Sequence, residues 1–446
     1  MNNVVSASIR QNSYTEWLAS IPTHWDVVRL RYLANGPLQY GANEAALEDN
    51  PDYPRFIRIT DINEDGTLRP DTFKSLSPDI AESFLLEEGD ILFARSGATV
   101  GKAFVYRETW GKACFAGYLI RFRCNFQLLL PDFLFFFTQS HLYWSQVREG
   151  SIQATIQNFS AEKYGEIIIP LPLLSEQRAI ADYLDSATAK IDALIAAKQR
   201  LLHLLAEKRR ALITHAVTRG LDATVPQRDS GVEWLGEIPR HWEVMRIKNV
   251  AQVGNGSTPR RDNDEYWQNG SFPWLTSTVV NDDIVGEPAH FVTDIALHEC
   301  HLPLVAPNSV LVAITGEGKT RGMAALLPYQ ATINQHMAYI TPWENTVTHE
   351  FVQLFLSGHY DILRMISEGT GSTKGALTCE QISEFPILLP PFEEQQSITA
   401  ATNLAKCRLD KLVKALEKTI FLLHERRTAL IASAVTGKLR VESSCN

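Results

Sequence analysis

Residues 234–251 read WLGEIPRHWEVMRIKNVA and repeat an earlier stretch of the chain, WLASIPTHWDVVRLRYLA at 17–34. Nine of the eighteen aligned positions are identical, and most of the others keep their chemical character. The two stretches lie 217 residues apart, about half of the 446-residue chain. Because short repeat arrays recur every 20–50 residues or so, this spacing indicates a single internal duplication. We therefore expect two copies of one fold.

The two copies also end alike. EKRRALITHAVT (207–218) matches ERRTALIASAVT (425–436) at eight of twelve positions, with an offset of 218 residues. Further upstream, YGEIIIPLPLLSEQ (164–177) aligns with ISEFPILLPPFEEQ (382–395) at the same offset. Each copy therefore has a repeated front, a repeated back and a middle in which the similarity fades.

The repeated back segments predict two long helices. Residues 176–217 contain neither proline nor glycine, and their apolar residues recur at alternating steps of three and four, as in a coiled-coil seam. The first predicted seam consists of Ile180, Leu184, Ala187, Ile191, Leu194, Leu201, Leu205 and Leu212. The second consists of Ile398, Thr402, Ala405, Leu409, Leu412, Leu416, Thr419, Leu423 and Leu430. A helix of this length measures roughly 60 Å, so we expect the two helices to pair and to separate two domains.

The middle of each copy predicts short strands bounded by turn residues, followed by a helix. Examples are DILFARSG (90–97) in the first copy and SVLVAITG (309–316) in the second. We expect an α+β fold with two pseudo-repeated mixed α/β domains, separated by two long helices that pair as a coiled coil. The expected divisions are 1–168 for the first domain, 169–221 for the central helical region, 222–386 for the second domain and 387–446 for the distal helical region.

The repeated IP-x-HW stretch marks the expected start of each domain. Its proline fixes the turn between large apolar anchors, which are Trp17, Trp25, Trp234 and Trp242. We expect His24 and His241, which lie next to these tryptophans, to be packed structural residues.

Composition excludes several classes of protein. A formal net charge of −9 argues against a protein that coats nucleic acid through bulk positive charge, although local basic surfaces remain compatible with it. The six cysteines form no C-x-x-C pair, so neither a zinc site nor a disulfide framework is indicated. HECH (298–301) matches no ligand spacing, and we expect no metal. The chain lacks the pattern of a signal peptide and a long apolar run, so we expect a cytoplasmic protein.

Motifs for catalysis are incomplete. AITGEGKT (313–320) resembles a phosphate-binding loop but has Ala313 in place of the first glycine, and no helix pattern follows it. We interpret it, like SGATVGKAF (96–104), as a hairpin-type loop that presents a lysine. LPPF (389–392) begins with a leucine where a base-methylating enzyme needs Asn or Asp to hold an amine. No nucleophile and base set stands out, so we expect a non-catalytic protein.

Taken together, several motifs resemble those of the specificity subunit of type I restriction-modification systems, over essentially the whole chain. They are EWLGEIPRHWEV (233–244), EWLASIPTHWDV (16–27), GDILFARSGATVGKAFV (89–105), INQHMAYI (333–340) and IPLPLLSEQRAIADYLD (169–185). The resemblance implies two target-recognition domains, each of which reads one half of a bipartite DNA sequence, and two long helices that form an antiparallel coiled coil and hold these domains apart. It also implies that the helices dock two modification subunits that methylate the DNA, and that restriction subunits join the complex and cleave.

The resemblance assigns the remaining roles. Cofactors are expected on partner subunits, namely S-adenosylmethionine, ATP and Mg²⁺, and none on this chain. Candidate positions on the partner-docking helices are Ile180, Leu184, Ile191, Leu194, Leu201, Leu205, Ile398, Leu409, Leu412, Leu416 and Leu423.

Polar and basic side chains in the strand-bound loops are candidates to contact base edges and phosphates. In the first domain they are Arg58, Thr60, Asp61, Arg95, Ser96, Thr99, Lys102, Gln153, Thr155 and Gln157. In the second they are Thr276, Ser277, Thr278, Lys319, Arg321, Asn334, Gln335, His336, Ser372, Thr373 and Lys374. Each of them also has an alternative interpretation as a loop cap or a solvated charge.

Two other functions stay open at this point. One is a catalytic DNA methyltransferase with unrecognised motifs, which would bind S-adenosylmethionine by itself. The other is a coiled-coil scaffold with two ligand-binding domains and no role on DNA. The acidic net charge agrees with a scaffold, whereas the repeated glycine and lysine loops favour DNA recognition.

Overall fold

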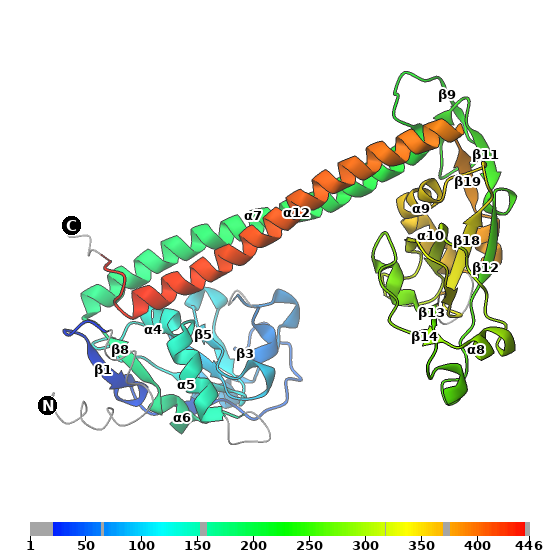
Figure 1. Cartoon of the computed structure of the whole chain (residues 1–446). Helices are drawn as coiled ribbons and strands as arrows, with labels where there is room; N and C mark the ends of the chain where they lie inside the picture. The colour runs from blue at the N-terminus through cyan, green and yellow to red at the C-terminus, as the bar shows by residue number, and fades with distance from the viewer. Residues whose placement is uncertain (1–20, 64–66, 152–157, 317, 369–374, 442–446) are drawn as a thin grey trace. The chain divides into compact units, whose positions relative to one another are not determined.

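A computed structural model describes residues 21–63, 67–151, 158–316, 318–368 and 375–441. The chain divides into two compact units (Figure 1). Unit 1 comprises Met1–Gln199 with Lys418–Asn446, and unit 2 comprises Arg200–Glu417. The division passes through both long helices, so each unit contains one part of each of them.

Unit 1 is built on a four-stranded sheet of order β2-β7-β4-β5. Its strands are β1 (Asp26–Arg29), β2 (Gln39–Tyr40), β3 (Arg55–Ile57), β4 (Ile91–Ala94), β5 (Ala103–Val105), β6 (Ala113–Phe115), β7 (Leu119–Phe122) and β8 (Ile168–Leu171). Its helices are α3 (Pro78–Ala81), α4 (Pro131–Thr138), α5 (His141–Ser151), α6 (Ala161–Glu166) and parts of α7 (Leu174–Arg219) and α12 (Phe392–Val435). Strand β3 pairs with β6 in parallel, and β1 pairs with β8 in antiparallel.

Unit 2 repeats this topology. Its strands are β9 (Gln227–Asp229), β10 (Glu237–Pro239), β11 (Glu243–Arg246), β12 (Ala251–Asn255), β13 (Phe272–Leu275), β14 (Phe291–Val292), β15 (Ser309–Ala313), β16 (Ala324–Leu327), β17 (Thr332–Ile333), β18 (Met337–Pro342) and β19 (Pro386–Leu389). Its own helices are α8 (Asp294–Glu299), α9 (His349–Gly358), α10 (Tyr360–Glu368) and α11 (Cys379–Ser383). The sheet β12-β18-β15-β16, the parallel pair β13 and β17, and the antiparallel pair β11 and β19 match their counterparts in unit 1. The prediction of two copies of one α+β fold is confirmed.

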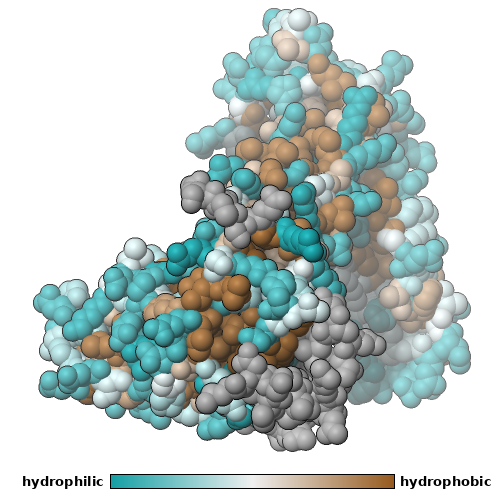
Figure 2. Space-filling view, turned by 90° about the vertical axis from the view of Figure 1, so that its left-hand side faces the viewer, coloured by the Kyte–Doolittle hydropathy of each residue, from teal (hydrophilic) through white to brown (hydrophobic). Residues whose placement is uncertain are grey.

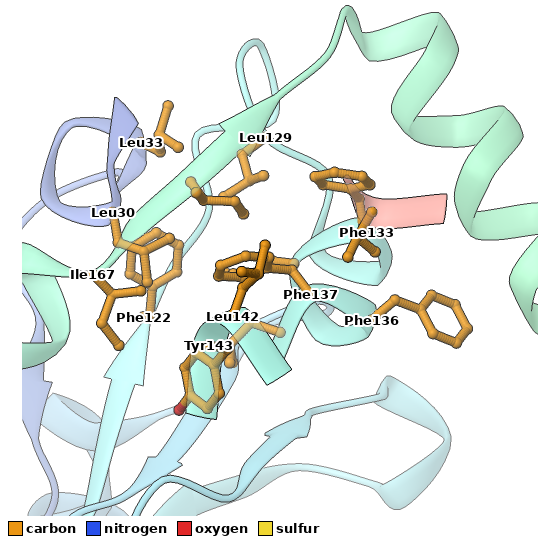
Figure 3. Close-up of a cluster of buried hydrophobic side chains, with 14 of the residues drawn as sticks. Leu30, Leu33, Phe122, Leu129, Phe133, Phe136, Phe137, Leu142, Tyr143 and Ile167 are labelled. Carbon is orange, nitrogen blue, oxygen red and sulfur yellow. The ribbon is translucent and has the colours of Figure 1, made fainter. Parts of the chain in front are cut away.

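The central strand of each sheet is buried on both faces. In β4, Ile91 and Phe93 belong to the largest core of unit 1, whereas Leu92 and Ala94 belong to a second core on the other face. This alternation follows from the two-residue period of a strand. Figure 3 shows part of the larger core, where Phe122 lies near side chains of α4 and α5. The apolar run DILF is therefore the centre of the domain, and the loops at the strand ends remain available for other roles.

A buried glutamine fixes the start of each long helix. Gln177 accepts a hydrogen bond from the Leu130 amide (2.8 Å) and donates to the carbonyls of Leu128 and Pro172, both at 2.9 Å. In unit 2, Gln395 makes the corresponding bonds to Thr348, Thr346 and Pro390. Both glutamines are 0% exposed. The glutamine of the repeated LP…EQ motif thus joins the helix to the loop before α4 or α9.

The two long helices pack in antiparallel directions within each unit. In unit 1, Asp192 of α7 pairs with Arg427 of α12 (2.9 Å), and in unit 2, Arg209 of α7 pairs with Asp410 of α12 (2.5 Å). These four residues are related by the repeat offset of 218. The same ion pair therefore occurs twice, with the roles of the helices exchanged.

The predicted seam is wrong by one residue over part of its length. Leu194, Leu201 and Leu412 are 52%, 43% and 53% exposed. Ile195 is buried instead of Leu194, and Leu202 and Val413 are half-buried. The next buried residue after Leu184 is Thr188, four positions further on, whereas the predicted seam continued three positions further on to Ala187. Because an ideal helix drifts relative to a strict heptad, a perfect alternation of three and four does not follow the contact stripe.

The prediction for the IP-x-HW stretch was correct for its buried tryptophans and wrong for its histidines. Trp25 and Trp242 are buried, as expected of anchors, and Trp234 stacks on Phe385 with a centroid distance of 5.2 Å. Trp17 lies outside the described residues. The two histidines are not packed inside. His24 and His241 are exposed and contact Glu176 and Glu394, at 3.3 and 2.8 Å, at the start of α7 and α12.

Candidate nucleic-acid interface

Three segments meet at one edge of each four-stranded sheet. We name residues 116–118 and 334–336, which precede β7 and β18, the central turns. The Ala116 amide donates to the carbonyl of Ile57, at the end of β3 (2.9 Å), and the Asn334 amide donates to Leu275, at the end of β13 (3.0 Å). Each central turn therefore lies beside the residues that follow the parallel strand, 58–61 in unit 1 and 276–278 in unit 2.

The loop after the central strand meets the same turn. The Arg95 amide donates to the Tyr118 carbonyl (3.0 Å), and the Ile314 amide donates to the His336 carbonyl (2.9 Å). This loop spans 95–102 in unit 1 and 314–322 in unit 2. The structure thus brings together the loops that carry most of the described candidate residues, and it does so in the same way in both units.

A glycine in each unit packs its backbone closely against the central turn or the residue before it. Gly41 follows β2, and Gly256 follows β12. A Cβ atom on Gly41 would lie 2.3 Å from the Ala116 carbonyl oxygen, and one on Gly256 would lie 1.9 Å from the Ile333 carbonyl oxygen. No side chain tolerates such an approach to backbone. The close packing of backbone on backbone makes the turn a rigid platform.

Buried tyrosines hold the loop 95–102 in unit 1. The Tyr143 hydroxyl donates to the Gly101 carbonyl (2.7 Å). The Tyr164 hydroxyl donates to the Ala94 carbonyl (2.6 Å) and accepts from the Gly101 amide (3.1 Å). Burial raises the pKa of both phenols, so both keep their donor proton. The loop that carries Ser96, Thr99 and Lys102 is therefore fixed from the inside of the domain.

Arg95 lies between this loop and the central turn. Its guanidinium is 4.8 Å from the centre of the Tyr40 ring and donates to the Gly117 carbonyl (3.3 Å). The neighbouring Tyr118 is 66% exposed. A guanidinium held on an aromatic face retains donors for an incoming ligand.

In unit 2 the central turn carries a chain of polar side chains. The Thr258 hydroxyl contacts the Gln335 amide oxygen, and the Gln335 amide nitrogen is 3.2 Å from Nε2 of His336. Nδ1 of His336 is 2.8 Å from the Thr315 hydroxyl. We name Thr258, Gln335, His336 and Thr315 the polar relay. Gln335 and His336 are both exposed, so the relay faces solvent.

The candidate residues fall into four groups. Exposed residues are Thr60, Thr278, Lys319, Gln335 and His336. Half-buried residues are Arg58, Arg95, Ser96, Thr99, Lys102, Thr276 and Ser277. Buried residues are Asp61, Arg321 and Asn334. Gln153, Thr155, Gln157, Ser372, Thr373 and Lys374 lie outside the described residues.

The three buried residues are corrections to the prediction, because they have almost no surface to offer to a base. Asp61 is 0% exposed and receives two hydrogen bonds from the Arg58 guanidinium, at 2.7 and 2.9 Å. Arg321 donates to the Gly375 carbonyl (2.8 Å) and to Glu368 (3.2 Å). Asn334 accepts the His336 amide inside the turn (3.1 Å). These side chains brace the loops.

Arg58 also has a bracing role. Its guanidinium donates to both Asp61 oxygens and to the Thr72 carbonyl (3.0 Å), and the Asp61 hydrogen bond raises its pKa. By contrast, no ion-pair partner is present for Arg95, Lys102 or Lys319 within the described part of the chain. These three cations therefore remain available for phosphate or base contacts.

Sequence reasoning missed four residues of the site. Tyr40 and Tyr118 flank Arg95, and Thr258 and Thr315 end the polar relay. One signal was present, since Tyr118 aligns with the candidate His336 at the repeat offset of 218. For Thr258 no signal existed, because only the fold brings it to Gln335.

Among the described residues, no group of three or more His, Cys, Asp or Glu side chains is arranged to hold a metal ion. In the same part of the chain, no helix combines the length and apolar character needed to cross a bilayer.

The duplicated architecture agrees with known families. The family model of the type I restriction modification DNA specificity domain matches residues 22–203 and again 239–420. The chain belongs to the type I restriction-modification DNA specificity family. It is a specificity subunit, the non-catalytic component that recognises DNA sequence through two domains.

Two curated relatives match 96% and 70% of the chain. A putative type I restriction enzyme MjaX specificity subunit from Methanocaldococcus jannaschii is 24% identical over 440 residues, which cover 96% of each chain. The MjaIX specificity subunit from the same organism is 23% identical over 318 residues, 70% of each chain.

Two solved structures share the fold. One, described as the structural basis of complex assembly and conformational transition of the type I R-M system, is 20% identical, with a TM-score of 0.69 and coverage of 94% of this chain and 99% of the other. The HsdS subunit from Thermoanaerobacter tengcongensis is 18% identical, with a TM-score of 0.56 and coverage of 94% and 98%.

Proposed function

We propose that each unit of this specificity subunit binds one half of a bipartite DNA target. The observation that carries the proposal is the duplicated site. Both units build the same backbone frame from a parallel strand end, a central turn and a loop, but they place different side chains on it. Two equivalent platforms with different surfaces suit two half-sites of different sequence.

The chemistry of the surface supports recognition of base edges. Amide, imidazole, hydroxyl and guanidinium groups offer the donors and acceptors that distinguish base pairs in the major groove. Lys102 and Lys319 are cations in loops next to the turn and suit phosphate contacts that set register. Local cations of this kind allow DNA binding by a chain whose net charge is −9.

The helices are proposed to dock two modification subunits, which restriction subunits join. Figure 2 shows a mostly hydrophilic face on which hydrophobic residues are exposed in separate patches. Exposed large hydrophobic residues on α7 and α12 are Tyr183, Leu194, Leu201, Leu204, Phe392, Leu404, Leu412, Phe421 and Leu422. A groove of about 810 Å³ lies along α12 in unit 1, where Phe421, Ala429 and Ala432 line it together with polar and charged residues such as Glu425 and Lys438. Exposed apolar side chains along both helices favour a protein partner.

The remaining assignments follow from this role. S-adenosylmethionine, ATP and Mg²⁺ are placed on the partner subunits, and this chain binds none of them. Because the DNA that such a system protects lies in the cytoplasm of its host, we also place the complex there. A methyltransferase or a scaffold without a DNA role is not favoured by the family of this chain.

The test is methylome sequencing of a methylation-deficient host that carries this chain with its cognate modification subunit, compared with the same host without this chain. We expect a new split motif with two unequal halves and a fixed gap. Exchange of residues 11–164 for those of another specificity subunit should change only one half. A verified complex that produces no methylation dependent on this chain would refute the proposal.

A further inference from the structure

The two central turns occupy the same place in the fold but carry different side chains. We propose that they are the specificity-determining elements of the two domains. Gln335 and His336 contact bases of one half-site, and Tyr118 with Arg95 contacts the other. Thr258 and Thr315 are positioning residues that orient Gln335 and His336. The inference rests on the proposed function and names the residues that carry it out.

Equivalence of the backbone is the first argument. A β-bridge joins Ser96 to Asn158 in unit 1 and Thr315 to Ala376 in unit 2. In each unit the carbonyl of the last turn residue, Tyr118 or His336, accepts the amide of the residue after the central strand. Because this frame is shared, a side chain on either turn meets its ligand in the same geometry. A difference in side chain then becomes a difference in the base that is read.

Each central turn presents exposed side chains on a buried backbone. Tyr118, Gln335 and His336 are exposed, whereas the preceding residues Ala116 and Asn334 are buried and brace the turn. An exposed side chain on a rigid, buried backbone reaches a ligand without reorganisation of the domain. The lysines of the neighbouring loop, Lys102 and Lys319, are more flexible and suit phosphate better than bases.

In unit 2 the polar relay fixes the reading side chains before DNA arrives. The Gln335 amide nitrogen is a donor, so Nε2 of His336 accepts and Nδ1 donates to Thr315. The Thr258 hydroxyl then donates to the Gln335 amide oxygen. Within the described residues, the second amide proton of Gln335 has no partner and remains free for a base acceptor. Ordering these side chains in advance lowers the entropic cost of binding.

In unit 1 the corresponding reader is aromatic and cationic. Tyr118 is exposed and offers a phenol that donates and accepts. The Arg95 guanidinium lies over the Tyr40 ring (4.8 Å) and donates to the carbonyl of Gly117, the residue before Tyr118. Guanidinium groups favour the paired acceptors of guanine in the major groove. We therefore expect a guanine in the half-site read by unit 1, opposite Arg95.

The experiment uses the full chain in complex with its modification subunit. Methylome sequencing defines the motif, and fluorescence anisotropy then measures affinity for duplexes changed in one half-site at a time. We expect Tyr118→Ala to relax or weaken recognition in one half-site only, by about 10- to 100-fold at one base pair. His336→Ala and Gln335→Ala should have the same effect on the other half-site only. Controls are Tyr32→Ala and His298→Ala, which remove exposed residues outside the turns.

The positioning residues need a separate readout. Thr258→Val and Thr315→Val remove a hydroxyl with little change in shape, and we expect each to weaken binding to the second unit's half-site several-fold. Thr258→Ser and Thr315→Ser keep the hydroxyl and should restore wild-type affinity. A purely structural role would not distinguish valine from serine in this way.

The outcomes separate the two proposals. If the wild-type complex gives a split motif but Tyr118→Ala and His336→Ala leave it and both affinities unchanged, the central turns are not the readers, while the proposed function stands. If both variants affect the same half-site, the inference is also wrong. If the wild-type complex gives no motif that depends on this chain, the proposed function fails, and the inference fails with it.

Discussion

Replacement of Gln177 by methionine tests how the repeated glutamine supports the fold. The side chain is 0% exposed and makes three hydrogen bonds with backbone groups, at 2.8, 2.9 and 2.9 Å. Methionine fills the same volume but leaves one buried amide and two carbonyls without these partners. Each unsatisfied group costs about 1–3 kcal/mol. Because the carbonyls can use their second lone pairs, we expect a total loss near the lower end, about 3 kcal/mol in the free energy of unfolding.

Thermal denaturation and hydrogen exchange measure this effect. A loss of about 3 kcal/mol lowers the melting temperature of a domain of this size by roughly 6–12 °C. Exchange should accelerate in the loop before α4 for Gln177→Met and in the loop before α9 for the equivalent Gln395→Met. The control is Gln396→Met, an exposed neighbour, which should stay within about 0.5 kcal/mol of wild type. A Gln177→Met variant as stable as this control would refute the reasoning.

Three further predictions concern stability. Asp283→Ala removes the 2.8 Å partner of Lys406, whose side chain is 8% exposed. Because Asp283 itself is 44% exposed, we expect only about 2 kcal/mol of lost free energy of unfolding in unit 2, measured by urea denaturation. Addition of Lys406→Met should restore most of the loss. Ile195→Ala should lower the free energy of unfolding by about 2–3 kcal/mol, and Leu194→Ala by under about 1 kcal/mol. The reverse order would support the strict heptad. Burial lowers the pKa of His359 from 6.5 to about 4, so the neutral form contributes stability that is full above pH 6.5 and is lost as pH falls towards 4. Denaturation between pH 7 and 4 should show a loss of roughly 3 kcal/mol that is absent in His359→Phe.

The duplication, the long helices and the fold class could be predicted from the sequence, because they depend on patterns that are local or that repeat. The helix register could not. Leu194 and Ile195 are adjacent apolar residues, and either fits a step of three or four from Ile191. Which of them is buried depends on the partner helix, whose drift a heptad count ignores.

The site shows the same limit. The candidate polar side chains lie in loops between strands, and the structure brings these loops together. The distinction between a bracing and a free residue was not available, because Arg58 and Arg95 look alike in sequence. Only the fold reveals that Arg58 is bound to Asp61 while Arg95 lies on the Tyr40 ring.

The division of the long helices has a consequence for synthesis on the ribosome. Unit 2 is a continuous stretch, Arg200–Glu417, but unit 1 needs Lys418–Asn446 to be complete. Ile431, Ala434 and Val435 belong to the same core as Phe93 and Phe133. The domain that emerges first therefore keeps part of its core uncovered until the end of α12 leaves the ribosome, and the domain that emerges second is the first that can finish folding.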